Sequence, residues 1–187
     1  MIVLIRHGQT AWSLTGQHTG LTDIPLTDVG VEGAKRLAPY LREIKFSRIL
    51  SSPLARAKDT AKFAGFEEIE IDQDLVEWDY GDTEGLTSAE MAKKIPGWSL
   101  FKNGVTNGES IQEVSSRAQT VISKIERDVD KNVLIFAHGH ILRIWAACWL
   151  QQDPHFAARL VLDPCSVSML GFEHDAKAVL RWNITDV

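Results

Sequence analysis

The chain begins with an uninterrupted apolar run over residues 1–5 that is rich in β-branched side chains. Such a run is typical of a strand buried on both faces, so we expect it inside a sheet. It ends abruptly in Arg6, His7 and Gly8. Ligands of open α/β sheets bind beyond the carboxyl ends of strands, which places Arg6 and His7 where chemistry usually occurs. From position alone, a strand end with two solvated polar residues fits equally well.

The rest of the chain alternates strand patterns with helical ones. Further strands are predicted at residues 48–51, 68–71, 133–136, 166–172 and 178–182. Helices are predicted after Thr27, over residues 54–64 behind Ser52 and Pro53, after Thr87, after Ser110 with an apolar face reaching Val129, and over residues 141–150. Loops are predicted at residues 11–25 and, as a surface excursion, at residues 98–108. We therefore expect one domain over residues 1–187, an α/β fold in the form of a three-layer αβα sandwich. Its central, mostly parallel sheet of about six strands has helices on both faces.

Net charge, apolar run length and cysteine content limit the kinds of binding partner and cellular location that we expect. The formal net charge of −5 argues against broad binding to nucleic acid or to an anionic membrane. No apolar run approaches the length of a membrane span, and the N-terminus lacks the pattern of a signal peptide. Cys148 and Cys165 lie in apolar surroundings without metal-site spacing, which favours buried free thiols. We expect a cytoplasmic protein whose oligomeric state is left open, a homodimer being one option.

Two strand ends look alike. Residues 133–136 run into Ala137, His138 and Gly139, just as residues 1–5 run into Arg6, His7 and Gly8. If both strands are parallel and central, the two histidines project from the same edge. Arg56 is expected in the first turn of the helix that follows residues 48–51, and the helix terminus adds partial positive charge. A cationic cluster in an acidic protein predicts an anion site, and the arginine fork suits phosphate.

The segments Arg6-His7-Gly8, Ser52-Pro53-Leu54-Ala55-Arg56-Ala57 and His138-Gly139 occur in the order and spacing of a known family. With them the chain resembles the histidine phosphatase superfamily, which includes the cofactor-dependent phosphoglycerate mutases. The resemblance spans nearly the whole chain. It implies a covalent phosphohistidine mechanism in which His7 is the nucleophile. The resemblance further implies that Arg6, Arg56 and His138 hold the phosphoryl oxygens.

The same resemblance places the catalytic acid in the loop that follows the third strand. Glu77 matches that position and would protonate the leaving oxygen and then help to deprotonate the attacking water. Asp79, Asp82 and Glu84 compete with it on spacing. Beyond the catalytic set His7, Glu77, His138, Arg6 and Arg56, the expected substrate-binding residues are Arg6, Ser13, Thr19, Gly20, Arg56, Gly139 and His140. His18 fits a solvated loop as well as substrate contact, and Arg143 is expected to be a surface or packing residue.

The sequence departs from the mutase pattern. Ser13 stands where the mutases often have asparagine, and His140 stands where they usually have asparagine as well. The acid loop lacks their arginine. Ser13, Gln17, Thr19, Gly20, the loop over residues 78–84 and the segment 138–140 are similar to the branch of sedoheptulose-bisphosphatase-type sugar phosphatases. Mutases also tend to carry an insertion that closes over the intermediate and excludes water, and this chain has little sequence for it. In a site that is open to water, phosphohistidine is hydrolysed.

We therefore expect hydrolysis of a small phosphorylated metabolite, such as a sugar phosphate or bisphosphate, without metal or cofactor. A phosphoglycerate-mutase-type transfer is the main alternative. His7, His138, His140 and Glu77 could in principle ligate zinc, but the neighbouring arginines would repel a cation. An inactive module that binds phosphorylated ligands is a third possibility, although His7, Glu77 and the arginines are all retained.

Overall fold

The computed structural model describes residues 1–126 and 131–186. Within these residues six strands form one mixed sheet in the order β3-β2-β4-β1-β5-β6. The bounds are β1 Ile2–Arg6, β2 Arg48–Ser51, β3 Glu70–Ile71, β4 Val133–Ala137, β5 Val167–Glu173 and β6 Ala176–Ile184. Strands β3, β2, β4 and β1 are parallel, whereas β5 and β6 are joined antiparallel at the β1 edge. The predicted α/β class and strand positions are confirmed.

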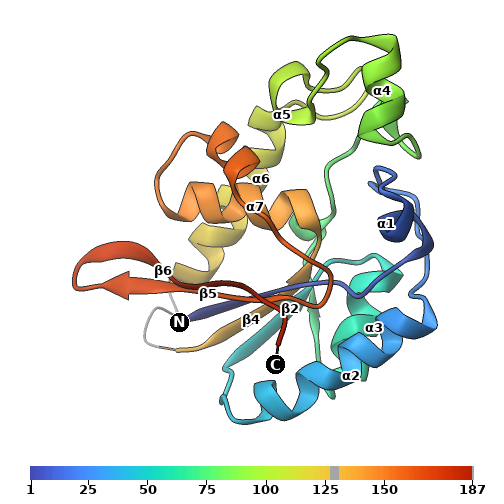
Figure 1. Ribbon diagram of the computed structural model, residues 1–187. Helices are drawn as coiled ribbons and strands as arrows, with labels where there is room; N and C mark the ends of the chain where they lie inside the picture. The colour runs from blue at the N-terminus through green and yellow to red at the C-terminus, as the bar shows by residue number, and fades with distance from the viewer. Residues whose placement is uncertain (127–130, 187) are drawn as a thin grey trace.

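Helices cover both faces of the sheet, as Figure 1 shows. On one face lie α2 Asp28–Arg42 and α3 Ala55–Phe63; on the other lie α6 Ile111–Ile125 and α7 Gly139–Trp149. Alternate residues of the central strand β1 enter opposite cores, because side chains of a strand alternate between its faces. Ile2 and Leu4 pack in the cluster with α6 and α7, whereas Val3 and Ile5 pack in the cluster with α2 and α3. A fully apolar strand is thus explained by burial on both sides.

The shorter elements connect these layers. They are α1 Ala11–Thr15, α4 Ser88–Lys94, α5 Leu100–Asn103 and the 3-10 turns Gln73–Leu75, Gly81–Thr83 and Pro154–Arg159. The predicted caps Thr27, Thr87 and Ser110 each accept a backbone N–H at the start of a helix. Val129, expected on the face of α6, lies outside the described residues.

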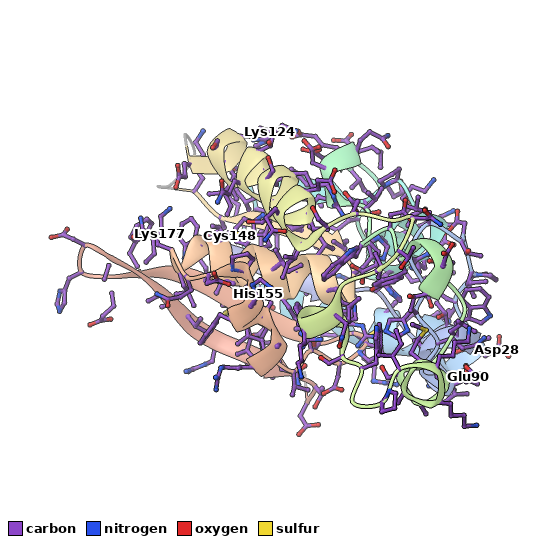
Figure 2. The ribbon with its side chains drawn as sticks, turned by 90° about the horizontal axis from the view of Figure 1, so that it is seen from above. Asp28, Glu90, Lys124, Cys148, His155 and Lys177 are labelled. Atoms are coloured by element: carbon purple, nitrogen blue, oxygen red, sulfur yellow. The ribbon has the colours of Figure 1, made fainter. Side chains whose placement is uncertain are left out.

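Four expectations were wrong in detail. The expected loop 11–25 contains α1, because Thr10 and Ser13 form a reciprocal capping box. Helix α3 begins at Ala55 rather than Leu54, and the Ala55 N–H is bound by Asp23, whereas Ser52 Oγ accepts the Leu54 N–H. The expected surface excursion 98–108 contains α5 and buries Trp98, Leu100 and Phe101 against the main core. The cysteines are free but half-buried; Cys148, on α7 (Figure 2), has its Sγ 3.2 Å from Ser115 Oγ of α6.

Among the described residues there is no helix of sufficient length and hydrophobicity to cross a bilayer.

Candidate active site

His7 and His138 lie side by side at the carboxyl edge of the sheet. The parallel pairing of β1 with β4 sets Arg6 opposite Ala137, so the residue after each strand is a histidine. The His7 backbone N–H donates to Ala137 O at 2.9 Å, and the two imidazole centroids are 5.2 Å apart. The expected meeting of the two strand ends is therefore confirmed.

The ring of His7 is fixed in one tautomer. Its Nδ1 lies 2.7 Å from Gly8 O, and a carbonyl can only accept, so Nδ1 carries the proton and Nε2 keeps its lone pair. Burial, followed by the charges of Arg6 and Arg56, holds the pKa of His7 well below its usual value. The buried ring is therefore neutral near pH 7, the form that a nucleophile requires.

Gly8 has no room for a side chain. A Cβ at this position would lie 2.6 Å from Gly30 O, a backbone atom of α2. The Gly8 N–H donates to Thr60 Oγ1 at 2.9 Å, and Thr60 Oγ1 donates in turn to Arg56 O at 2.6 Å. One hydroxyl therefore joins the loop of the nucleophile to the helix that carries Arg56.

Arg56 and His138 form a buried pair behind the nucleophile. Arg56 Nε donates to His138 Nδ1 at 3.0 Å, so His138 carries its proton on Nε2 and donates it to Ser52 Oγ at 2.7 Å. Other guanidinium hydrogens of Arg56 bind the carbonyls of Thr19, Gly20 and Thr22. Burial is the main cause that lowers the pKa of both side chains, and the Arg56 charge adds to the effect on His138.

Arg6, unlike Arg56, borders the cavity. One of its terminal nitrogens donates to Leu162 O, whereas its Nε is buried without a partner. An unpaired buried donor is costly, which makes this N–H a natural contact for an anion. Gly139 lies directly beside it, where a Cβ would be 3.5 Å from Arg6 Nε.

Glu77 is held at the N-terminus of α7. Its Oε2 accepts the His140 N–H at 2.9 Å, and its Oε1 accepts the Ile141 and Trp78 N–H groups, each at 2.9 Å. A helix N-terminus favours a carboxyl group by its dipole and its free N–H donors. Glu77 borders the cavity together with His7.

The three competing carboxylates have other partners. Asp79 Oδ1 accepts the Gly81 N–H, Asp82 Oδ2 accepts an amide hydrogen of Asn107, and Glu84 accepts the N–H groups of Gly20 and Thr22. None of the three borders the cavity that His7 lines, within the described ranges. The geometry therefore favours Glu77 as the acid.

The cavity has a volume of about 510 Å³ and one aromatic wall. Of the predicted binding residues, Arg6, Ser13, Thr19, Gly139 and His140 border it. Gly20 and Arg56 lie behind this lining, and the Ser13 hydroxyl is engaged with the Thr10 backbone.

Sequence reasoning missed part of the lining. Tyr80, Trp98, Phe101 and Arg143 all border the cavity. Arg143, expected on the surface, has its guanidinium carbon 4.9 Å from the Phe101 ring centroid and donates Nε–H to Ala157 O. Its position one turn after His140 on α7 was the available signal. Trp98 and Phe101 carried none, because long-range packing alone brings them to the site.

No group of three or more histidine, cysteine or acidic side chains in the described ranges is placed to hold a metal ion.

Comparison with known proteins agrees with this arrangement. The model of the histidine phosphatase superfamily (branch 1) matches residues 2–185. An acid phosphatase of Mycobacterium tuberculosis is 35% identical over 187 residues, 98% of this chain and 92% of that protein. Sedoheptulose 1,7-bisphosphatase of Saccharomyces cerevisiae is 34% identical over 179 residues, 79% of this chain and 66% of the yeast protein.

A solved structure of an open-reading-frame product of Mycobacterium tuberculosis matches with a TM-score of 0.94 and 34% identity, covering 98% of this chain and 96% of that one. The resemblance drawn from the three sequence motifs is thereby confirmed. This chain belongs to the histidine phosphatase superfamily (branch 1).

Proposed function

We propose that the enzyme hydrolyses small phosphomonoesters through a covalent phosphohistidine intermediate on His7. The observation that carries this proposal is the tautomer of His7: its Nδ1–H is bound by Gly8 O, which leaves the Nε2 lone pair as nucleophile. The neutral state of the ring, which follows from its lowered pKa, supports the same role.

In the first step Nε2 of His7 attacks phosphorus, and the N–P bond forms as the P–O bond to the leaving group breaks. Arg6, whose Nε has no partner, borders the cavity and would bind a phosphoryl oxygen with its guanidinium. The hydrogens of Arg56 and His138 are held by protein acceptors, so behind the lining Arg56 contributes its positive charge. Glu77, in its protonated form, gives its proton to the leaving oxygen, since an alkoxide is a poor leaving group.

In the second step water attacks the phosphohistidine, Glu77 takes a proton from it, and the N–P bond breaks to release inorganic phosphate and neutral His7. The charges of Arg6 and Arg56 would repel a metal cation from this pocket, so we assign the chemistry to protein groups alone. Arg6 at the cavity and the buried Arg56 behind it would supply the charge stabilisation that this transfer needs.

Hydrolysis fits the site better than transfer to a second substrate. A mutase holds a bisphosphorylated intermediate and benefits from extra cations around the mouth. Among the described residues that line this cavity, Arg143 is the one cation besides Arg6, and it packs on the Phe101 ring and donates to Ala157 O. Water that reaches a phosphohistidine cleaves it. The relatives named as acid phosphatase and sedoheptulose 1,7-bisphosphatase support the same choice, and a small phosphorylated metabolite such as a sugar phosphate is the expected substrate.

The test is hydrolysis of 4-nitrophenyl phosphate with excess chelator by the wild type, by His7→Ala and by the matched control His155→Ala. His155 is exposed on the turn Pro154–Arg159 (Figure 2). We expect chelator-resistant turnover in the wild type and the control, and a loss of at least about 10³-fold in His7→Ala. Acid-stable label from ³²P substrate is not expected, because phosphohistidine is acid-labile; alkaline quenching should retain it on His7.

Turnover that chelator abolishes would overturn the metal-free mechanism. Turnover that survives in His7→Ala would overturn the covalent one.

A further inference from the structure

Two imidazole rings, His18 and His140, share one wall of the cavity. Their centroids are 6.3 Å apart and their planes differ by 21°, so the rings are stacked. His18 comes from the loop after α1, and His140 from the first turn of α7. Neither has a part in the chemistry proposed above beyond the His140 backbone N–H that binds Glu77.

His18 presents an acceptor to the cavity. Its Nδ1 lies 2.6 Å from Leu86 O, and since a carbonyl only accepts, Nδ1 carries the proton of the neutral ring. The backbone fixes this contact, because the His18 N–H also donates to Leu86 O and His18 O accepts the Gly85 N–H, each at 2.9 Å. The Nε2 of His18 therefore holds a lone pair.

His140 presents a donor. Its Nδ1 lies 2.6 Å from Tyr80 Oη, and the buried phenol has no other hydrogen-bond partner among the described residues. We assign the phenol proton to this contact, because it gives the phenol an acceptor within the protein, and the ring proton then lies on Nε2. Burial raises the pKa of Tyr80 and lowers that of His140, so both groups stay neutral near pH 7.

Both Nε2 atoms are available to a ligand. Neither has a hydrogen-bond partner in the described part of the chain, and neither is sealed from the surface. Aromatic neighbours hold the rings in place: Trp98 meets His18 edge-on at 5.5 Å, and Phe101 lies 5.5 Å from His140. The cavity therefore carries a rigid acceptor beside a rigid donor.

We propose that His18 and His140 are specificity-determining residues that bind hydroxyl groups of the leaving group, so that the substrate class is a polyol or sugar phosphate. A hydroxyl accepts from His140 Nε2–H and donates to His18 Nε2, which satisfies both edges. A leaving group without hydroxyls would displace water from these edges and leave them unpaired, at a cost in binding. This inference rests on the proposed phosphatase function and deepens it.

The test compares glycerol 3-phosphate with propyl phosphate, which have the same phosphoryl group and chain length but differ in hydroxyls. The readout is the ratio of the two kcat/KM values at about pH 8, where histidine is neutral. We expect the wild type to prefer the glycerol ester by about tenfold or more. His18→Phe and His140→Phe, which keep a ring in place, should each bring the ratio toward one, whereas the control His155→Phe keeps it.

A wild-type ratio near one overturns the inference, as does a ratio that both ring variants preserve. Turnover of 4-nitrophenyl phosphate without turnover of either alkyl ester also overturns it and leaves the phosphatase function standing. If the folded wild type hydrolyses none of the three esters, the proposed phosphatase function itself is refuted. Independently of activity, ¹⁵N–¹H correlation spectra should show His18 protonated on Nδ1 and His140 on Nε2; the opposite tautomers would refute the assignment.

Discussion

Thr60 shows how much one hydroxyl can decide at this site. It accepts the Gly8 N–H and donates to Arg56 O, and both bonds are buried. Gly8 in turn supplies the carbonyl that selects the tautomer of His7. The orientation of the nucleophile thus depends on a side chain that touches neither phosphate nor water, which makes Thr60 a positioning residue.

Thr60→Val keeps the shape of the side chain but leaves the Gly8 N–H buried and unpaired. We expect a loss of about 1–3 kcal/mol in the free energy of unfolding. We also expect a fall of about tenfold in kcat with little change in KM, because the geometry of attack is disturbed. Thr60→Ser restores the hydroxyl and should recover most of kcat. Equal kcat in the valine variant and the wild type would show that Gly8 holds His7 without Thr60.

At the scale of elements, α6 fixes the loop that carries Glu77. All five N–H donors of Arg117 are used: Nε and one terminal nitrogen bind the Glu109 carboxylate, and the terminal nitrogens also bind the carbonyls of Asp74, Val76 and Glu77. Glu109 also accepts the Asp79 N–H at 3.0 Å. Both sides of Glu77 are therefore tied to Arg117 on α6 and to its ion-pair partner Glu109, just before that helix.

Arg117→Lys keeps the charge but cannot reproduce this planar set of contacts. We expect kcat for phosphate esters to fall about 10- to 100-fold, since a displacement of the acid by about 1 Å is enough for such a loss. Lys124 is on the same helix α6 and makes partly exposed ion pairs with Asp72 and Asp74 at the turn Gln73–Leu75. Lys124→Ala is therefore the matched control and should change stability by less than about 1 kcal/mol. Steady-state kinetics measures the effect of each variant on kcat, and urea unfolding measures its effect on stability. A lysine variant with wild-type kcat would contradict the positioning role.

For the whole molecule, three imidazoles make stability depend on pH: the buried His7 and His138 and the half-buried His140. Burial holds the pKa values of His7, His138 and His140 well below that of an exposed histidine. Below the unfolded value of about 6.5 the unfolded chain binds protons that the folded chain does not. The free energy of unfolding should therefore be fully retained above about pH 7 and fall as the pH decreases, by up to about 1.4 kcal/mol per pH unit for each ring.

Urea unfolding between about pH 7.5 and 5.5 measures this slope. His140→Phe should reduce the dependence of the free energy of unfolding on pH by the contribution of one imidazole. His155 is exposed, so His155→Phe should leave that dependence unchanged. A slope that His140→Phe does not alter would mean that this ring is protonated in the folded state as well.

How far the sequence predicts this molecule depends on the range of the interactions. β1 and β4 were predictable because strands buried on both faces consist of consecutive apolar residues. Arg6 ends β1, and His7 and His138 directly follow the two strands. Trp98, Phe101 and the clamp by Arg117 were not predictable. Their partners are distant in the chain, and in the case of Arg117 most are backbone carbonyls, which carry no residue signal.

The contact between Gly8 and Gly30 has a consequence for how this chain can change by mutation. A side chain at Gly8 collides with Gly30 O, and one at Gly30 collides with Gln9 O. Both substitutions place a side chain where the two backbone segments meet, so the second substitution cannot relieve the collision caused by the first. As the sequence diverges, both positions should therefore remain glycine, while the aromatic wall of the cavity is free to change for new leaving groups.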